Sequence, residues 1–145
     1  MAGKRVINID EANLSKTNFV RQAWQIRGKT LRPFKNPLIA AVDNLGASYF
    51  SVSQTVNNSR TFSTFLQRLV LILDAEDPDW RDETILVLDG ALTHRSEETR
   101  RAMAALKVPV MIAGPYGFDG SPCEKLFALL KVGELNPDDI KTGKR

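Results

Sequence analysis

The feature that most constrains the fold is an almost continuous apolar run, ETILVLD, at residues 83–89. A short run without polar alternation is typical of a strand buried on both faces, as in sheets covered by helices. Residues 96–107 then have the pattern of a helix, residues 108–114 (VPVMIAG) that of a second buried strand, and residues 121–131 that of a further helix. This alternation predicts parallel strands joined by right-handed crossovers, and hence an α/β fold.

Several shorter strands are expected before this alternation. Alternating or branched side chains predict strands at residues 4–11, 19–27, 37–43 and 48–56. After Ser59 the spacing changes to three and four residues, which predicts a helix whose apolar face holds Phe62, Phe65, Leu66, Leu69, Val70 and Leu73. We therefore predict one mixed sheet of about five strands with helices packed on it.

The length of 145 residues fits a single domain. We place this domain at residues 1–135 and expect residues 136–145 (NPDDIKTGKR) to form a flexible tail. The N-terminal residues lack the apolar core of a signal peptide, and no apolar run approaches the roughly 18 residues that span a bilayer. An intracellular protein without a membrane partner is expected.

Cysteine and histidine are too rare for two common kinds of site. Cys123 is the single cysteine and His94 the single histidine, so neither an internal disulfide nor a zinc site of cysteine and histidine ligands can form. Any metal must therefore be bound by oxygen.

Positive charge is concentrated in one segment. Between Glu11 and Asp43 there is no acidic residue. The basic residues there are Lys16, Arg21, Arg27, Lys29, Arg32 and Lys35. Such a segment suits a polyanion such as DNA, and the alternative is an ordinary solvated face.

Asp89, at the end of the apolar run, fits three kinds of chemistry. The aspartate phosphatase motif D-x-D-G-T needs a nucleophilic aspartate two residues earlier, where this chain has Val87. A phosphate-binding loop at residues 23–30 would need a helix after Thr30, which Pro33 prevents. The remaining chemistry is metal-dependent cleavage of nucleic acid, which needs further carboxylates.

Asp10 and Glu124 are the further carboxylates that we select. If residues 4–11 and 83–89 form adjacent parallel strands, Asp10 and Asp89 meet at their carboxyl ends, where ligands bind in open α/β sheets. Glu124 begins the last helix; it also fits a capping box with Ser121, so a purely structural role stays open. Asp43, at another strand end, is the rival for the position of Asp10.

Close carboxylates need a cation. Two charges about 4 Å apart repel by roughly 4 kcal/mol at an effective dielectric constant of 20. Ligation by oxygen alone selects Mg²⁺ or Mn²⁺.

Asp10 in INIDE, Asp89 in LVLDGALTH and Glu124 in SPCEKLFALLK together resemble the catalytic triad of the DDE transposases of the Tc1/mariner and IS630 superfamily. Residues 90 to 123 separate the last two acids, and this spacing of 34 residues is the hallmark of the Tc1-like branch. The flanking positions that also resemble the family are Trp24, Gly28, His94 and the stretch LIAAVDNLG.

The resemblance implies a ribonuclease H-like fold and a transposase catalytic core. It implies DNA strand cleavage and strand transfer at transposon ends by a two-metal mechanism, with two Mg²⁺ or Mn²⁺ ions per active site bound by Asp10, Asp89 and Glu124. The implied partners are double-stranded DNA, as transposon ends and target, and a second copy of the chain in a homodimer. The implied compartment is the nucleus in a eukaryote, or the cytoplasm and nucleoid in a bacterium.

The sequence departs from the family at three places. Gly90 replaces the usual asparagine, GPYGFDGSP replaces a more proline-rich loop, and no helix-turn-helix region precedes the first strand. The alternative function is thus a truncated or domesticated module that binds DNA or assists assembly without catalysis. In the family that the chain resembles, isolated cores often lack activity without their DNA-reading domain. For His94, contact with DNA phosphate or water and a hydrogen bond to the backbone at a helix start both stay open.

Overall fold

A computed structural model describes residues 4–15, 35–53, 57–114 and 122–132. Its elements, in chain order, are β1 (Arg5–Ser15), β2 (Lys35–Asp43), β3 (Ser48–Val52), α1 (Ser59–Glu76), α2 (Trp80–Glu83), β4 (Thr84–Leu88), α3 (Leu92–Arg95), α4 (Glu97–Ala105), β5 (Val110–Ile112) and α5 (Pro122–Val132). The predicted strand at residues 19–27 and the predicted tail at 136–145 lie outside the described residues, as do Trp24, Gly28 and Ser121.

The described strands form one five-stranded sheet in the order β3-β2-β1-β4-β5. Neighbouring strands are antiparallel between β1 and β2 and between β2 and β3, and parallel between β1 and β4 and between β4 and β5. The mixed sheet predicted from the sequence is therefore confirmed, including the parallel pairing of the first strand with the apolar run.

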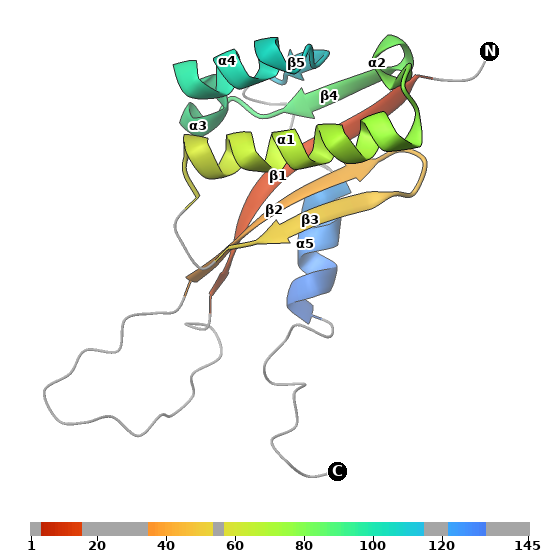
Figure 1. The fold of residues 1–145 in the computed structure, drawn as a ribbon. Coiled ribbons are helices and arrows are strands. Elements are labelled where there is room, and N and C mark those ends of the chain that lie inside the picture. The colour runs from red at the N-terminus through yellow and green to blue at the C-terminus, as the bar shows by residue number, and fades with distance from the viewer. Residues whose placement is uncertain (1–3, 16–34, 54–56, 115–121, 133–145) are drawn as a thin grey trace, which may run out of the picture.

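Helices cover the two faces of the sheet. In Figure 1, α1 crosses the front of the sheet with α4 beside it, and α5 lies behind. Ile7 and Ile9 of β1 belong to the core under α1, whereas Ala12 packs with Cys123 and Phe127 of α5. Because alternate residues of a strand point to opposite faces, Asp10 leaves β1 on the α5 side and Glu11 on the α1 side.

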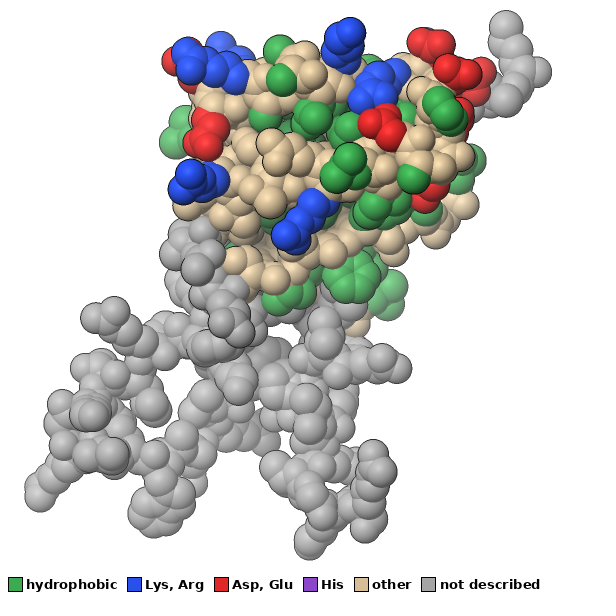
Figure 2. Space-filling view, viewed as in Figure 1, with side chains coloured by type: hydrophobic (Ala, Val, Ile, Leu, Met, Phe, Trp, Pro, Cys, Tyr) green, Lys and Arg blue, Asp and Glu red, His purple; other side chains and the backbone are tan. Residues whose placement is uncertain are grey.

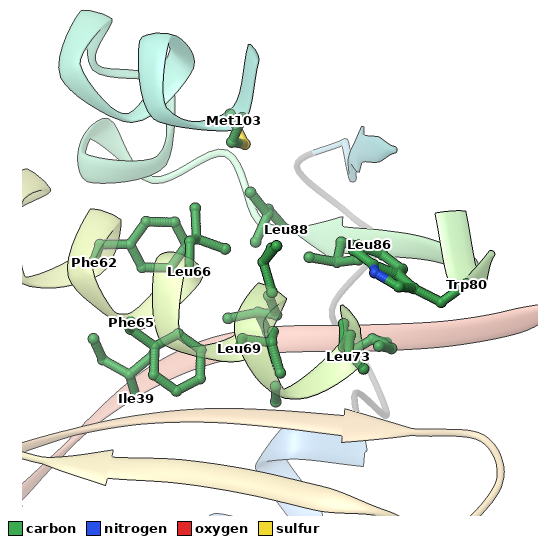
Figure 3. Packing of buried hydrophobic residues seen from close by; sticks show 14 residues of the cluster. Ile39, Phe62, Phe65, Leu66, Leu69, Leu73, Trp80, Leu86, Leu88 and Met103 are labelled. Atoms are coloured by element: carbon green, nitrogen blue, oxygen red, sulfur yellow. The ribbon is translucent and has the colours of Figure 1, made fainter. Parts of the chain in front are cut away.

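Helix α1 supplies most of the core on its face. Asn58 caps its first turn, since its side-chain oxygen accepts a hydrogen bond from the Thr61 amide at 2.9 Å. The apolar positions predicted from the spacing are all buried, and Figure 3 shows Phe62, Leu66 and Leu69 among them in one cluster with Leu86 and Leu88 of β4. This packing fixes α1 over the strands that carry the candidate acids.

Strands β4 and β5 are less covered than the sequence suggested. In β4 the side chains of Thr84, Leu86 and Leu88 are buried, but those on the other face are half-buried. The prediction of a second buried strand is wrong for β5, because Met111 and Ile112 are 50% and 42% exposed. The reason is position: β5 is an edge strand, and α5 packs on β1 and β2.

Two short helices, α2 and α3, were also not predicted, because four residues carry too little periodicity to reveal them. None of the helices in the described ranges is both long and apolar enough to cross a membrane.

Candidate active site

The carboxyl end of β4 brings Asp10 and Asp89 together. The parallel register pairs Ile9 with Leu88, so the next residue on each chain segment is an aspartate. β4 ends there, whereas β1 continues beside β2, with Asp10 opposite Ala40. An open pocket of about 320 Å³ lies at this edge and is lined by Asp10, Glu11, Ala12, Asn57, Asp89, Ala91 and His94.

Local hydrogen bonds orient the carboxylate of Asp89. Its Oδ1 accepts a hydrogen bond from the Ala91 amide at 2.9 Å and lies 2.6 Å from Nδ1 of His94. The side chain is 26% exposed, so it remains open to the pocket. The turn after β4 therefore places this acid at the sheet edge with one oxygen fixed.

Asp10 is under electrostatic strain. Burial raises its pKa, and the negative charges of Asp89 and Glu124 raise it further. The Glu11 amide, which donates to Oδ1 of Asp10 at 2.8 Å, and the nearby His94 act in the opposite direction. A cation in the pocket would relieve this strain, because it favours the charged carboxylate.

Glu124 is held near this pair by the residue before it. Cys123 is fully buried, and its thiol donates to the Asn8 carbonyl at 3.1 Å, two residues before Asp10. Cys123 packs in a buried cluster with Leu38 and Phe127. Glu124 itself is exposed in the first turn of α5, and its charge acts on Asp10, although it does not line the pocket.

The structure thus brings Asp10 and Asp89 together at one edge of the sheet, with Glu124 near enough for its charge to act on Asp10 but outside the pocket. Among the described side chains, no three acidic, histidine or cysteine groups stand in an arrangement ready to hold a metal ion. Like charges favour such separation when no cation offsets their repulsion. The donor set itself, three carboxylates, is of the chemistry that Mg²⁺ and Mn²⁺ prefer.

His94 lies buried between two carboxylates of the site. Its side chain is only 1% exposed, and its ring nitrogens face Asp89 Oδ1 at 2.6 Å and Glu11 Oε1 at 3.2 Å. Burial lowers the pKa of His94, but the hydrogen bond to Glu11 and the charges of Asp89 and Glu11 outweigh this and raise it. The ring lies between two carboxylates at the pocket, and the contact of His94 with DNA stays a prediction.

Sequence reasoning missed two polar residues that line the pocket. Glu11 was not selected because the strand was predicted to stop at residue 11, whereas β1 runs on to Ser15. Asn57 precedes the cap of α1, and its Oδ1 is buried without a hydrogen-bond partner among the described residues. Nothing in the sequence marks Asn57, because its place depends on how α1 enters the fold.

Asp43, the rival for Asp10, has a structural role. Its side chain is fully buried, binds Arg5 at 2.8 Å, and accepts hydrogen bonds from the amides of Leu45 and Ala47. It therefore fixes the turn between β2 and β3, toward the opposite end of the sheet from Asp89.

The basic segment is almost entirely outside the described residues. Lys16, Arg21, Arg27, Lys29 and Arg32 fall within residues 16–34, and Lys35 is the first residue of β2. In the described part of the face shown in Figure 2, basic and acidic side chains are interspersed.

Comparison with known proteins identifies relatives of this fold. The family model of the DDE superfamily endonucleases matches residues 5–142. A comparison with curated proteins gives no match.

Three solved structures illustrate the likeness. A pre-cleavage Mos1 transpososome has a TM-score of 0.66 and 20% identity, over 88% of this chain and 42% of that one. The Mos1 transposase catalytic domain with raltegravir and Mg has a TM-score of 0.62 and 20% identity, over 88% of this chain and 59% of that one. A simian T-cell lymphotropic virus intasome has a TM-score of 0.66 and 14% identity, over 99% of this chain and 44% of that one. The likeness confirms the ribonuclease H-like fold, and the chain spans less than two-thirds of each of these relatives.

Proposed function

The chain belongs to the DDE superfamily endonucleases, and we propose that it is the catalytic core of a transposase of the Tc1/mariner and IS630 type. In this role it cuts DNA strands at transposon ends and joins them to a target. The observation that carries the proposal is the pairing of β1 with β4, which sets Asp10 beside Asp89 over an open pocket. The spacing of 34 residues between Asp89 and Glu124 supports the Tc1-like assignment.

We assign Asp10, Asp89 and Glu124 as ligands of two Mg²⁺ or Mn²⁺ ions. When bound, such ions activate a nucleophile and stabilise the leaving oxygen of a phosphodiester. The residues of this chain supply the negative charge that attracts the ions, and the hydrogen bonds from Ala91 and Glu11 orient two of the three carboxylates. The Mos1 catalytic domain was solved with Mg and with Mn, which supports this choice of metal.

We propose double-stranded DNA as substrate and a homodimer as the active form. Similar structures are described as a transpososome, a paired-end complex and an intasome. The basic residues Lys16, Arg21, Arg27, Lys29, Arg32 and Lys35 are the proposed DNA surface, and residues 1–135 the catalytic domain, followed by a tail at 136–145. The protein would act where DNA is, in a nucleus or a nucleoid.

A second function is favoured by one observation. Glu124 does not line the pocket that Asp10 and Asp89 share. A module that binds DNA or assists assembly without cutting would not need the third acid in the pocket.

Mn²⁺ titration followed by calorimetry separates the two functions and does not require a DNA-reading domain. The catalytic proposal expects saturable Mn²⁺ binding by the wild-type chain and at least a tenfold weaker affinity in Asp89→Asn. It also expects metal-dependent nicking of duplex DNA that Asp89→Asn abolishes. Asp43→Asn is the matched control, because it alters a buried aspartate away from the pocket and should leave Mn²⁺ affinity unchanged. A wild-type chain that binds no Mn²⁺ favours the non-catalytic module.

A further inference from the structure

We infer that Glu11 and His94 are positioning residues, which together hold the Asp89 carboxylate in the orientation that receives a divalent cation. This inference rests on the proposed function, because it concerns the same three-carboxylate site. It assigns a role to two side chains that the proposed metal ligands do not include.

The first step is the contact between His94 and Asp89. Nδ1 of His94 lies 2.6 Å from Oδ1 of Asp89, and the same oxygen accepts from the Ala91 amide at 2.9 Å. Within the described residues, both contacts of the carboxylate are made by Oδ1. Oδ2 is therefore the oxygen that the side chain offers to a ligand in the pocket.

The second step is the immobility of the His94 ring. Its centroid lies 4.3 Å from that of Phe62, a fully buried residue of α1. Its backbone amide donates to the Ala91 carbonyl at 3.1 Å, which ties the short helix α3 to the turn after Asp89. The Phe62 ring on one side and a carboxylate at each nitrogen therefore restrict the His94 ring to one orientation.

The third step is the position of Glu11. Its Oε1 lies 3.2 Å from Nε2 of His94, although the two are 83 positions apart in the chain. Its backbone amide also donates to Oδ1 of Asp10 at 2.8 Å. The side chains of Asp10 and Glu11 leave β1 on opposite faces. Glu11 can therefore support Asp10 through its backbone amide and Asp89 through the His94 ring.

This chain of contacts distinguishes the arrangement from a histidine that merely fills space. A packing histidine needs an apolar surrounding and one hydrogen bond, whereas this one connects a pocket-lining acid on β1 to the acid that follows β4. Residues that orient a metal ligand in this way typically change metal affinity by about 10- to 100-fold when they are removed.

The experiment measures Mn²⁺ affinity of the full chain by calorimetry and folding by circular dichroism, in the wild type and three Glu11 variants. Glu11→Asp keeps the charge but withdraws the oxygen from Nε2 by one methylene. Glu11→Gln keeps an oxygen at the same reach but removes the charge, and Glu11→Ala removes both. We expect about 10- to 100-fold weaker Mn²⁺ binding in Glu11→Ala and Glu11→Asp, and affinity within about threefold of the wild type in Glu11→Gln.

Glu76→Ala is the matched control. Glu76 is also an acid that binds another side chain, the Tyr49 hydroxyl at 3.1 Å, and it pairs with Arg5 at the start of β1. The Mn²⁺ affinity of Glu76→Ala should equal that of the wild type.

The possible failures are distinct. A folded Glu11→Asp chain that binds Mn²⁺ as tightly as the wild type overturns the inference and leaves the proposed function standing. If Glu11→Ala does not fold, the Mn²⁺ affinities of Glu11→Asp and Glu11→Gln test the inference without it. A wild-type chain that takes up no Mn²⁺ overturns the proposed function and this inference with it.

Discussion

Nδ1 of His94 lies 2.6 Å from Oδ1 of Asp89, so the acid that ends the apolar run is paired with the one histidine of the chain. The contact spans only five residues, yet it holds because β4 stops at Leu88 and α3 turns the chain back over the sheet edge. The charges and the packing around this edge lead to four predictions.

The pairing of His94 makes stability depend on pH. Its pKa is raised in the folded chain, so its favourable contribution is complete below the unfolded value of about 6.5 and is lost as pH rises through the folded value. We expect His94→Asn to lower the free energy of unfolding more at pH 6 than at pH 9, measured by urea denaturation without metal. Glu11→Gln should move this loss to lower pH, because it removes one charge that raises the pKa. A difference in the free energy of unfolding between wild type and His94→Asn that does not change with pH would contradict the prediction.

Asp10 should also make the metal-free chain less stable as pH rises, but here the charged form is the unfavourable one. Burial raises its pKa, as do the charges of Asp89 and Glu124, so the folded chain binds this proton more tightly than the unfolded chain does. Its ionisation therefore costs stability as pH rises above the unfolded value. We expect Asp10→Asn to raise the unfolding temperature of the metal-free chain at pH 7, measured by differential scanning calorimetry.

Asp43→Asn provides the comparison for Asp10→Asn. Asp43 is paired with Arg5 and accepts two amide hydrogen bonds, so its replacement should lower the unfolding temperature. An unfolding temperature that falls in Asp10→Asn, as it does in Asp43→Asn, would show that Asp10 is not under electrostatic strain.

Gly90 should tolerate replacement by asparagine, which is the usual residue at this position in the DDE transposases that the chain resembles. A Cβ atom at Gly90 meets no heavy atom within 4 Å, and the positive φ among the described glycines belongs to Gly46, at 96°. We expect Gly90→Asn to change the free energy of unfolding by less than about 0.5 kcal/mol. Gly46→Ala, where a side chain strains the backbone, should cost about 1 kcal/mol or more. Chemical denaturation of both variants measures the difference, and equal costs would refute the argument.

Leu69 tests the core that supports the site. It is 1% exposed on the inner face of α1, whereas Leu71 on the same helix is 68% exposed. We expect Leu69→Ala to cost about 2 to 5 kcal/mol because it leaves a cavity against the sheet. Leu71→Ala should stay within about 0.5 kcal/mol. Urea midpoints of the two variants check this, and similar midpoints would mean that α1 is not packed as described.

The local pattern of the chain determined most of the elements. The three- and four-residue spacing after Ser59 fixed α1, and the apolar run before Asp89 fixed β4, because amphipathic and apolar patterns reflect which face each element must bury. The pairing of Asp10 with Asp89 also followed, since parallel strands bring their carboxyl ends to one edge.

Tertiary structure alone decided the rest. Which strand lies at the edge, and so exposes Met111, depends on where the helices settle on the sheet. The enclosure of His94 between Asp89 and Glu11 joins residues 83 positions apart, and it arises only when β1 runs past β4 and α3 folds over that edge. A sequence encodes the preference of each segment through its own neighbours, but a contact between distant segments depends on register and packing that local periodicity does not carry.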